Sequence, residues 1–512
     1  MRREKVLTEF AKVINSDRYQ YTESDVFFQN KMEEKIAVFD VFFRKTEDGG
    51  FAVVSGIEDV LELINILNTT TYEEKKDYFK EVLEETDLIE YLSNLKFTGD
   101  LYAMRDGEIA YPNEPIITIK APLIQGKILE TPILNIINHQ MAIATKASRV
   151  SRAAGDIKVS AFGSRRAHGF SSSVLGSKAA YIGGCHDHSN LVAEYLFDIP
   201  SIGTMSHSYI QTFGVGKEAE KKAFDTFVQT RKKRNKNSLI LLVDTYNTLN
   251  IGINNAIQAF KDNGIDDSYE GIYGIRIDSG DLAYLSKKCR KKLDKAGLKK
   301  AIITLTNSLD EELILSLKEQ NASVNFFGVG DAISVSKSNP CFGGVYKISE
   351  IDGKALIKLS DDSIKVSNPC FKKVYRIYQD SEAKADLISL ANNDSDVNLL
   401  LENAEIIIRD EKSRLKQTIF EKNSYSVKCL NLKMIYKGSF TENASLVLDI
   451  KESRKYYEKS LASLAEERKR LKFPHMYKVD LSQDLYTTKI KLISSISKQI
   501  EKEKLWKNYI LS

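Results

Sequence analysis

The amino-acid sequence predicts an α/β protein in which short parallel strands alternate with helices through the central part of the chain. Six apolar runs between residues 156 and 347 each end in a small, polar tail and then pass toward a helical pattern. A length of 512 residues exceeds one ordinary hydrophobic core and indicates two or three domains. With only 8 prolines in the chain, a long proline-rich linker between these domains is not expected.

The first 130 residues mix strand and helix signals, which is typical of an α+β domain. Residues 36–43 are apolar and β-prone, and residues 51–67 continue from a strand into a run of helical period. Turn residues divide residues 96–120 into short strands. A helix is expected to follow, over residues 131–154.

The central apolar runs predict parallel strands whose carboxyl ends gather the unusual residues of the chain. Parallel strands joined by helices either close into a barrel or form an open, doubly wound sheet, and the pattern alone leaves both open. In both arrangements ligands bind at the carboxyl ends of the strands. The six runs are residues 157–166, 200–208, 239–248, 273–281, 301–310 and 324–331.

Beyond the central part, the chain is expected to continue with a hairpin and further helices. The hairpin turns at Asp352-Gly353, and charged amphipathic helices are expected at residues 451–472 and 488–504.

Composition excludes several classes of protein. Hydrophobic residues make up 42% and charged residues 28%, the balance of a soluble globular chain. A net charge of +4 is too small to indicate nucleic-acid binding. Five scattered cysteines without CxxC spacing suit a thiol-reducing compartment, and neither a signal peptide nor an apolar stretch long enough for a membrane span is visible. A cytoplasmic protein without membrane or nucleic-acid partners is expected.

The segment IRIDSGD is the most informative part of the chain. Strand alternation places Arg276 and Asp278 on one face, and Asp281 falls where a carboxylate caps the following helix. An arginine beside two carboxylates suits an anionic ligand rich in oxygens and bound with magnesium. An Asp-Ser-Gly turn with a helix cap and a surface ion pair is the alternative.

Two further strand ends carry groups that suit phosphate or carboxylate. Arg165 and Arg166 follow the first central run, and guanidinium groups bind such anions in a bidentate manner. Gly328 and Gly330 offer backbone N–H groups for a phosphate nest. Ordinary surface arginines and a plain turn are the alternatives.

His207 lies among the small hydroxyl residues Thr204, Ser206 and Ser208. A histidine at a strand end can act as an acid, a base or a phosphoryl acceptor, or it can simply be satisfied by hydrogen bonds. No zinc site is expected, because no cluster of cysteine and histidine residues has the spacing typical of one, and the direct ligands of magnesium stay open.

These segments, in this order, resemble the nicotinate phosphoribosyltransferase family over nearly the whole chain, from residue 17 to about residue 485. The resemblance is carried by the blocks DRYQYT, VFDVFFRK, GFAVVSGIEDVLE, FGSRRAHG, YIGGCHDHSN, IPSIGTMSHSYIQTF, LVDTYNT, IRIDSGDLAYLSKK, TNSLDE, FFGVGD and GGVYKISEI.

The resemblance implies an irregular TIM-like α/β barrel of the type II phosphoribosyltransferases, with an N-terminal α+β domain and a C-terminal extension. The expected division is residues 1–130, then the barrel with its active site at residues 131–347, then an extension at residues 348–512 that packs on the N-terminal domain. The implied reaction joins nicotinate to 5-phosphoribosyl 1-pyrophosphate in NAD salvage, giving nicotinate mononucleotide and pyrophosphate. Mg²⁺, ATP as a co-substrate, a phosphohistidine and a homodimer are implied as well.

The resemblance also implies a role for individual residues. His207 would be the phosphohistidine, and Asp278 would be catalytic as well as facing the ribose and magnesium. The nicotinate-binding residues would be Tyr19, Arg166, Thr204, Ser208 and Arg276. The residues binding phosphoribosyl pyrophosphate would be Arg165, Asp278, Gly280, Asp281, Gly328, Gly330 and Asp331.

The chain departs from the family pattern at four positions near these blocks. Arg18 stands where leucine is usual, His168 where glutamine is usual and Ser206 where alanine is common. Asp331 replaces a small hydroxyl residue and brings a carboxylate near the expected phosphate. Two alternatives to the implied function are a nicotinamide phosphoribosyltransferase of the same fold and a catalytically inactive protein that binds pyridine nucleotides.

Overall fold

The chain folds into two compact units. The computed structural model describes residues 9–46, 48–234, 238–359, 366–410, 413 and 415–511, without the side chains of residues 501–511. The first unit comprises Met1–Met141 and Cys341–Ser512, and the second comprises Ala142–Pro340. The helix α6 (Glu130–Ala154), expected at residues 131–154, contributes residues to both units. The three-part division at residues 130/131 and 347/348 stays a proposal.

A wholly parallel sheet of six strands forms the centre of the second unit, in the order β7-β6-β11-β10-β9-β8. Its middle strands are apolar and buried, as expected for parallel strands covered by helices. The strands are β6 (Lys158–Ala161), β7 (Asp187–His188), β8 (Ser238–Leu242), β9 (Ile272–Ile277), β10 (Ile302–Leu305) and β11 (Phe326–Val329).

The strand order identifies this sheet as part of a barrel. From β8 to β11 each strand lies beside the next one in the chain, and β11 then pairs with β6. This order is a circular permutation of the chain order, whereas a doubly wound sheet reverses its order at a switch point. The α/β prediction is therefore confirmed, in the form of a parallel half-barrel whose edges, within the described residues, are β7 and β8.

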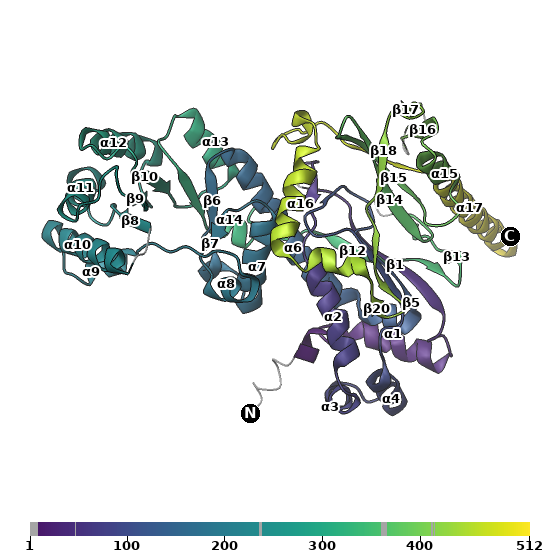
Figure 1. Cartoon of the computed structure of the whole chain (residues 1–512). Coiled ribbons are helices and arrows are strands. Elements are labelled where there is room, and N and C mark those ends of the chain that lie inside the picture. Colours follow the sequence, from purple (N-terminus) through teal and green to yellow (C-terminus); the bar gives the residue numbers. More distant parts are fainter. Residues whose placement is uncertain are drawn as a thin grey trace. The chain divides into compact units, whose positions relative to one another are not determined.

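Helices connect successive strands of the half-barrel. α10, α11 and α12 are neighbours on the outer side of β8, β9 and β10 (Figure 1). The elements are η3 (Ser164–Arg166), α7 (Phe170–Ile182), α8 (Leu191–Phe197), α9 (His207–Gln211), α10 (Lys217–Lys233), the π-helical turn η4 (Thr248–Gly252), α11 (Ile253–Asp262), α12 (Leu282–Lys295), α13 (Glu311–Glu319) and α14 (Asp331–Ser334).

The expectation of a strand within residues 200–208 is wrong. Only Ser201 bridges to the sheet, through a parallel pairing with His188. Ser206 then caps α9 by accepting a hydrogen bond from the Tyr209 backbone N–H at 3.2 Å, so His207 begins a helix. The strand that follows β6 is instead the two-residue β7.

The first unit is built on a seven-stranded antiparallel sheet, in the order β13-β12-β1-β5-β3-β19-β20. β12 and β13 form the hairpin expected at Asp352-Gly353, where both residues have positive φ, 46° and 73°. The strands are β1 (Ile36–Phe43), β3 (Asp100–Ala103), β5 (Ile117–Pro122), β12 (Gly344–Ile351), β13 (Lys354–Ala355), β19 (Leu432–Tyr436) and β20 (Ser439–Phe440).

The other strands that the structure describes in this unit form three smaller sheets: β18-β14-β15-β21, β16-β17 and β2-β4. Their strands are β2 (Ala52–Val53), β4 (Ile109–Ala110), β14 (Lys372–Gln379), β15 (Glu382–Leu390), β16 (Ile406–Arg409), β17 (Gln417–Phe420), β18 (Ser426–Cys429) and β21 (Lys478–Leu481). β14 carries the fully buried Arg376, which bonds the carboxylates of Glu108 at 2.8 Å and Asp386 at 2.7 Å. This network joins N-terminal and C-terminal segments of the unit.

Helices cover these sheets. The segment expected to be helical over residues 451–472 is α-helical only to residue 462, and the segment expected at residues 488–504 lies inside a longer helix. The elements are η2 (Glu9–Lys12), α1 (Arg18–Gln29), α2 (Ile57–Thr69), α3 (Tyr72–Val82), α4 (Thr86–Asn94), α5 (Leu123–Ile128), α15 (Ser395–Leu401), η6 (Glu442–Val447), α16 (Ile450–Ala462), η7 (Glu466–Arg468) and α17 (Gln483–Leu511). No helix among the described residues combines the length and apolar character needed to cross a membrane.

Candidate active site

A small polar cavity of about 110 Å³ lies at the carboxyl ends of the half-barrel strands. Most of the residues that the sequence singled out for anion binding meet here. The lining residues are Phe162, Arg165, Arg166, Arg276, Asp278, Thr306, Asn307, Ser308, Gly328, Gly330 and Asp331.

Arg276 on β9 organises the centre of this site. Its guanidinium lies 3.1 Å from the Asp278 carboxylate, so the two residues lie together as strand alternation predicted. It also donates to the hydroxyls of Thr306 at 2.9 Å and Thr204 at 3.2 Å. Arg276 thus joins the ends of β9 and β10 to the segment that precedes His207.

His207 is held between a hydroxyl and two carboxylates. Its Nδ1 lies 3.0 Å from the Thr245 hydroxyl. Its Nε2 lies 3.8 Å from a carboxylate oxygen of Asp278 and 3.9 Å from one of Asp244. Two anions beside Nε2 favour a proton on that nitrogen, which leaves the lone pair on Nδ1.

Asp244 follows β8, at a strand end where ligands were expected, but no specific role was predicted for it. Its Oδ2 accepts hydrogen bonds from the Asp278 backbone N–H at 3.0 Å and the Ser279 hydroxyl at 2.5 Å. Its Oδ1 is buried and has no hydrogen-bond partner among the described atoms. Since buried polar atoms are normally paired, this oxygen suits a ligand or the Nε2 proton of His207.

The turn after β9 is shaped by Gly280 and Asp281. Gly280 has φ +79°, a conformation that glycine adopts without strain. The Asp281 side chain accepts a hydrogen bond from the Tyr284 backbone N–H at 2.9 Å and caps α12. The expected helix cap is therefore confirmed, while the expected contact of both residues with phosphoribosyl pyrophosphate stays a prediction.

Gly328 and Gly330 both line the cavity, but only one of them is crowded. A Cβ on Gly328 would lie 2.6 Å from the Thr306 methyl and 2.7 Å from the Phe162 ring. A Cβ on Gly330 would meet nothing closer than 3.7 Å. Close packing at the end of β11 therefore requires glycine at residue 328, and this requirement is independent of any phosphate.

Arg166 and Asp331 form an ion pair across the cavity, with Nη1 and Oδ1 3.4 Å apart. Arg165 and His168 are exposed on the same loop. The Ser208 hydroxyl lies 2.8 Å from the Ser206 hydroxyl at the start of α9.

Tyr19 belongs to the first unit, where it lies near the start of α1 with 43% of its surface exposed. The Lys127 ammonium lies 4.8 Å from its ring centroid. Burial, followed by the charge of Glu130, raises the pKa of the Tyr19 phenol. The neighbouring Arg18 donates a hydrogen bond to the Val82 carbonyl at 3.0 Å.

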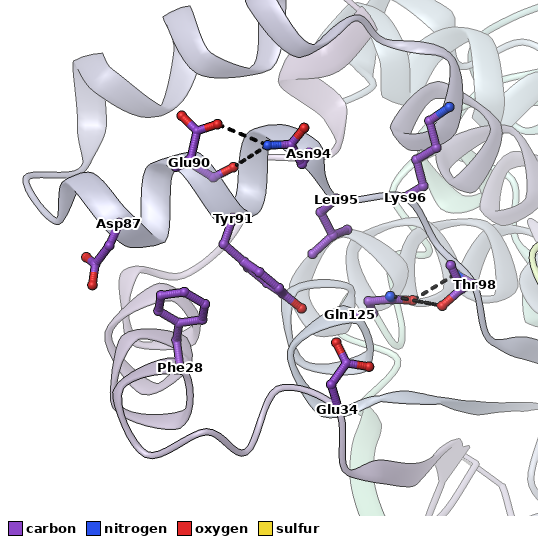
Figure 2. Close-up of a pocket in the computed structure, with 10 residues that line it drawn as sticks. All are labelled: Phe28, Glu34, Asp87, Glu90, Tyr91, Asn94, Leu95, Lys96, Thr98 and Gln125. Carbon is purple, nitrogen blue, oxygen red and sulfur yellow. Dashed lines mark hydrogen bonds between the residues drawn. The ribbon is translucent and has the colours of Figure 1, made fainter.

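A second cavity, of about 560 Å³, lies in the first unit and contains none of the predicted site residues (Figure 2). Its residues are Phe28, Glu34, Asp87, Glu90, Tyr91, Asn94, Leu95, Lys96, Thr98 and Gln125. The Phe28 and Tyr91 rings lie 5.0 Å apart. Burial and the nearby carboxylates of Glu34 and Glu33 raise the pKa of Tyr91 to about 12.

Three family models match successive parts of the chain. The nicotinate phosphoribosyltransferase N-terminal domain matches residues 14–138, the nicotinate phosphoribosyltransferase family residues 157–388, and the corresponding C-terminal domain residues 371–489.

Relatives in other organisms match over most of their lengths. The nicotinate phosphoribosyltransferase of Bacillus subtilis is 36% identical over 503 residues, covering 96% of this chain and 97% of its own. That of Dictyostelium discoideum is 30% identical, covering 94% of this chain and 88% of its own.

Solved structures share the fold at lower identity. Human nicotinic acid phosphoribosyltransferase has a TM-score of 0.77 at 23% identity and covers 94% of this chain and 100% of its own. A nicotinate-nucleotide pyrophosphorylase from Pyrococcus furiosus has a TM-score of 0.62 at 22% identity, covering 89% and 96%. The half-barrel with its flanking N-terminal and C-terminal parts is therefore the type II phosphoribosyltransferase fold.

Proposed function

The chain belongs to the nicotinate phosphoribosyltransferase family and is an enzyme of that family, and from this membership we propose the following reaction. The enzyme joins nicotinate to 5-phosphoribosyl 1-pyrophosphate, giving nicotinate mononucleotide and pyrophosphate for NAD salvage. ATP hydrolysis is coupled to this synthesis through a phosphorylated His207. The observation that carries the proposal is that the His207 ring lies beside Asp278, which lines the cavity together with Arg276.

In the transfer step, the nicotinate ring nitrogen attacks the anomeric carbon as the bond to the pyrophosphate oxygen breaks. The electrons of that bond leave with pyrophosphate, so positive charge develops on the ribose. Such a step needs anion-binding groups and fixed geometry more than a protein nucleophile. Arg276 is one of the cations that line the cavity, and its hydrogen bonds to Thr204 and Thr306 hold it in place.

In the coupling step, His207 accepts the γ-phosphoryl group of ATP and ADP leaves. The carboxylates beside Nε2 favour the tautomer protonated there, so Nδ1 is the nucleophile, once the Thr245 hydroxyl has released it. A phosphoryl group adds about −1.5 to −2 charges beside the site. Attack by water later returns free histidine and inorganic phosphate.

Magnesium fits the oxygen donors of this site. Among the described residues no group of three or more His, Cys, Asp or Glu side chains is close enough to form a complete metal site. The buried, unpaired Oδ1 of Asp244 and the Asp278 carboxylate are hard oxygen donors, and Mg²⁺ is commonly held by one or two carboxylates together with substrate phosphates. When bound, the ion would neutralise the charge of pyrophosphate.

We also propose a homodimer. α8 presents an apolar face on which Leu191, Tyr195 and Leu196 are 76%, 86% and 56% exposed, and Phe170 at the start of α7 is 73% exposed. Several exposed apolar side chains on one short stretch of the surface are typical of protein interfaces. The proposed occupant of this face is a second copy of the chain.

Substrate identity is tested by product analysis. Purified protein is incubated with phosphoribosyl pyrophosphate, Mg²⁺ and ATP, and with either nicotinate or nicotinamide, and the mononucleotides are separated. We expect nicotinate mononucleotide from the first mixture. Product from nicotinamide alone would assign the other phosphoribosyltransferase activity, and binding without product from either would identify a pyridine-nucleotide-binding protein.

A further inference from the structure

Asp331 places a negative charge in a cavity that otherwise suits anions. It is the first residue of α14, directly after β11, and shares the cavity with Arg165, Arg166 and Arg276. Its Oδ1 lies 3.4 Å from the Arg166 guanidinium, and its Oδ2 lies 4.0 Å from the Lys337 ammonium. The Asp331 carboxylate thus lies between two cations. A phosphate or a substrate carboxylate would also be stabilised in that position.

The course of the backbone brings Arg166 and Asp331 together. β6 and β11 are paired in parallel, with Ala161 opposite Val329, so the loops carrying Arg166 and Asp331 leave the sheet side by side. At Gly163 the loops touch: a Cβ there would lie 2.5 Å from the Ser334 Cβ and 2.6 Å from the Gly330 carbonyl oxygen. The ion pair is therefore a consequence of strand register and loop packing.

With the ion pair formed, the cavity is small. Its volume of about 110 Å³ is well below the 300–1,000 Å³ typical of small-molecule sites. The Arg166 side chain is 56% exposed, so it can swing away without disturbing the core. Opening the pair would enlarge the cavity and free a guanidinium.

We propose that Asp331 is an internal competitor for the substrate's anionic groups: it holds Arg166 until the charge of a bound phosphate repels the Asp331 carboxylate from the guanidinium. Phosphoribosyl pyrophosphate then binds first, and the released Arg166 becomes available to the carboxylate of nicotinate. This ordering rests on the proposed function. The resemblance implied that Asp331 helps to bind phosphoribosyl pyrophosphate. Here, by contrast, the Asp331 carboxylate opposes the binding of phosphate.

The test compares Asp331→Asn and Asp331→Ser with the unaltered protein, using inorganic pyrophosphate and ribose 5-phosphate as probes in titration calorimetry. Removing one charge about 5 Å from a phosphate dianion in a water-exposed site should tighten binding about tenfold. The gain should shrink at high salt because the interaction is screened. Asp294→Asn is the matched control, since the exposed Asp294 pairs with Arg290 near the end of α12 and the substitution changes the net charge equally.

A second readout follows the proposed order of binding. Without phosphoribosyl pyrophosphate, both Asp331 variants should bind nicotinate more tightly than the unaltered protein, because Arg166 is already free. Equal or weaker binding of the phosphate probes by both variants would overturn the proposal, and weaker binding only with Mg²⁺ would identify Asp331 as a metal ligand instead. Failure of the unaltered protein to bind either probe would also overturn it. Mononucleotide formation, measured in parallel, separates each of these results from failure of the proposed function.

Discussion

Asp244 is the residue on which the geometry around His207 depends. It accepts hydrogen bonds from the Asp278 backbone N–H and the Ser279 hydroxyl, and its other oxygen faces His207. We expect Asp244→Asn to lower ATP hydrolysis at least 100-fold, because an amide removes an anion that favours the Nε2–H tautomer.

The measurement is ADP release at saturating substrates. Asp225→Asn on α10 is the control, since Asp225 pairs with the Lys221 ammonium on the same helix, away from the half-barrel cavity. Full ATP hydrolysis by Asp244→Asn would contradict the assigned role.

Substitution of Gly328 and of Gly330 should affect the stability of the protein differently. Because a Cβ at residue 328 would overlap Thr306 and Phe162 while one at residue 330 would not, Gly328→Ala should lower the free energy of unfolding by about 1–3 kcal/mol. Gly330→Ala should change it by less than about 1 kcal/mol. Urea unfolding of both variants measures the difference, and equal losses would show that the packing at β11 is looser than described.

Glu220 on α10 makes the free energy of unfolding depend on pH. Its side chain is buried, receives one hydrogen bond from Asn255 at 3.0 Å, and leaves its other oxygen unpaired. Burial, with a further contribution from Asp244, raises the pKa of Glu220 to about 7. Because the folded state holds this proton more tightly than the unfolded state, stability falls as the pH rises from the unfolded pKa through 7.

The Glu220→Gln variant should therefore be more stable than the unaltered protein at pH 8, by about 1–2 kcal/mol. The difference should disappear toward pH 4.5. Thermal unfolding across this pH range measures it, with the exposed Glu218→Gln on the same helix as the control. A difference that does not vary with pH would contradict the raised pKa.

Local sequence patterns predicted most elements of the half-barrel and the core of its site. Strand alternation is a local property, and from it the contact of Arg276 with Asp278 could be predicted. The helix cap at Asp281 could be predicted because a carboxylate precedes an amphipathic run. The contact of Asp244 with the Asp278 backbone was not predictable, because it depends on the pairing of β8 with β9. The two-residue β7 was too short to give a pattern.

The whole molecule combines a half-barrel site with an exposed apolar face on α8. If that face is the contact between two copies, Leu191→Asp and Tyr195→Asp should each shift the protein from dimer to monomer, because a charge would be buried in an apolar interface. Light scattering after gel filtration measures the mass. Leu401→Asp, at a 64% exposed position on α15, is the control, and an unchanged dimer in all three variants would move the interface elsewhere.

The proposed function depends on the coupling of ATP hydrolysis to mononucleotide synthesis through His207. The most direct measurement follows nicotinate mononucleotide and ADP together, with and without ATP, in the unaltered protein and in His207→Ala. We expect ATP to stimulate synthesis with matching ADP release in the unaltered protein, while His207→Ala loses ADP release but retains a weak, reversible transfer. ADP release that persists in His207→Ala, or equal and complete loss of both activities, would contradict this division of roles.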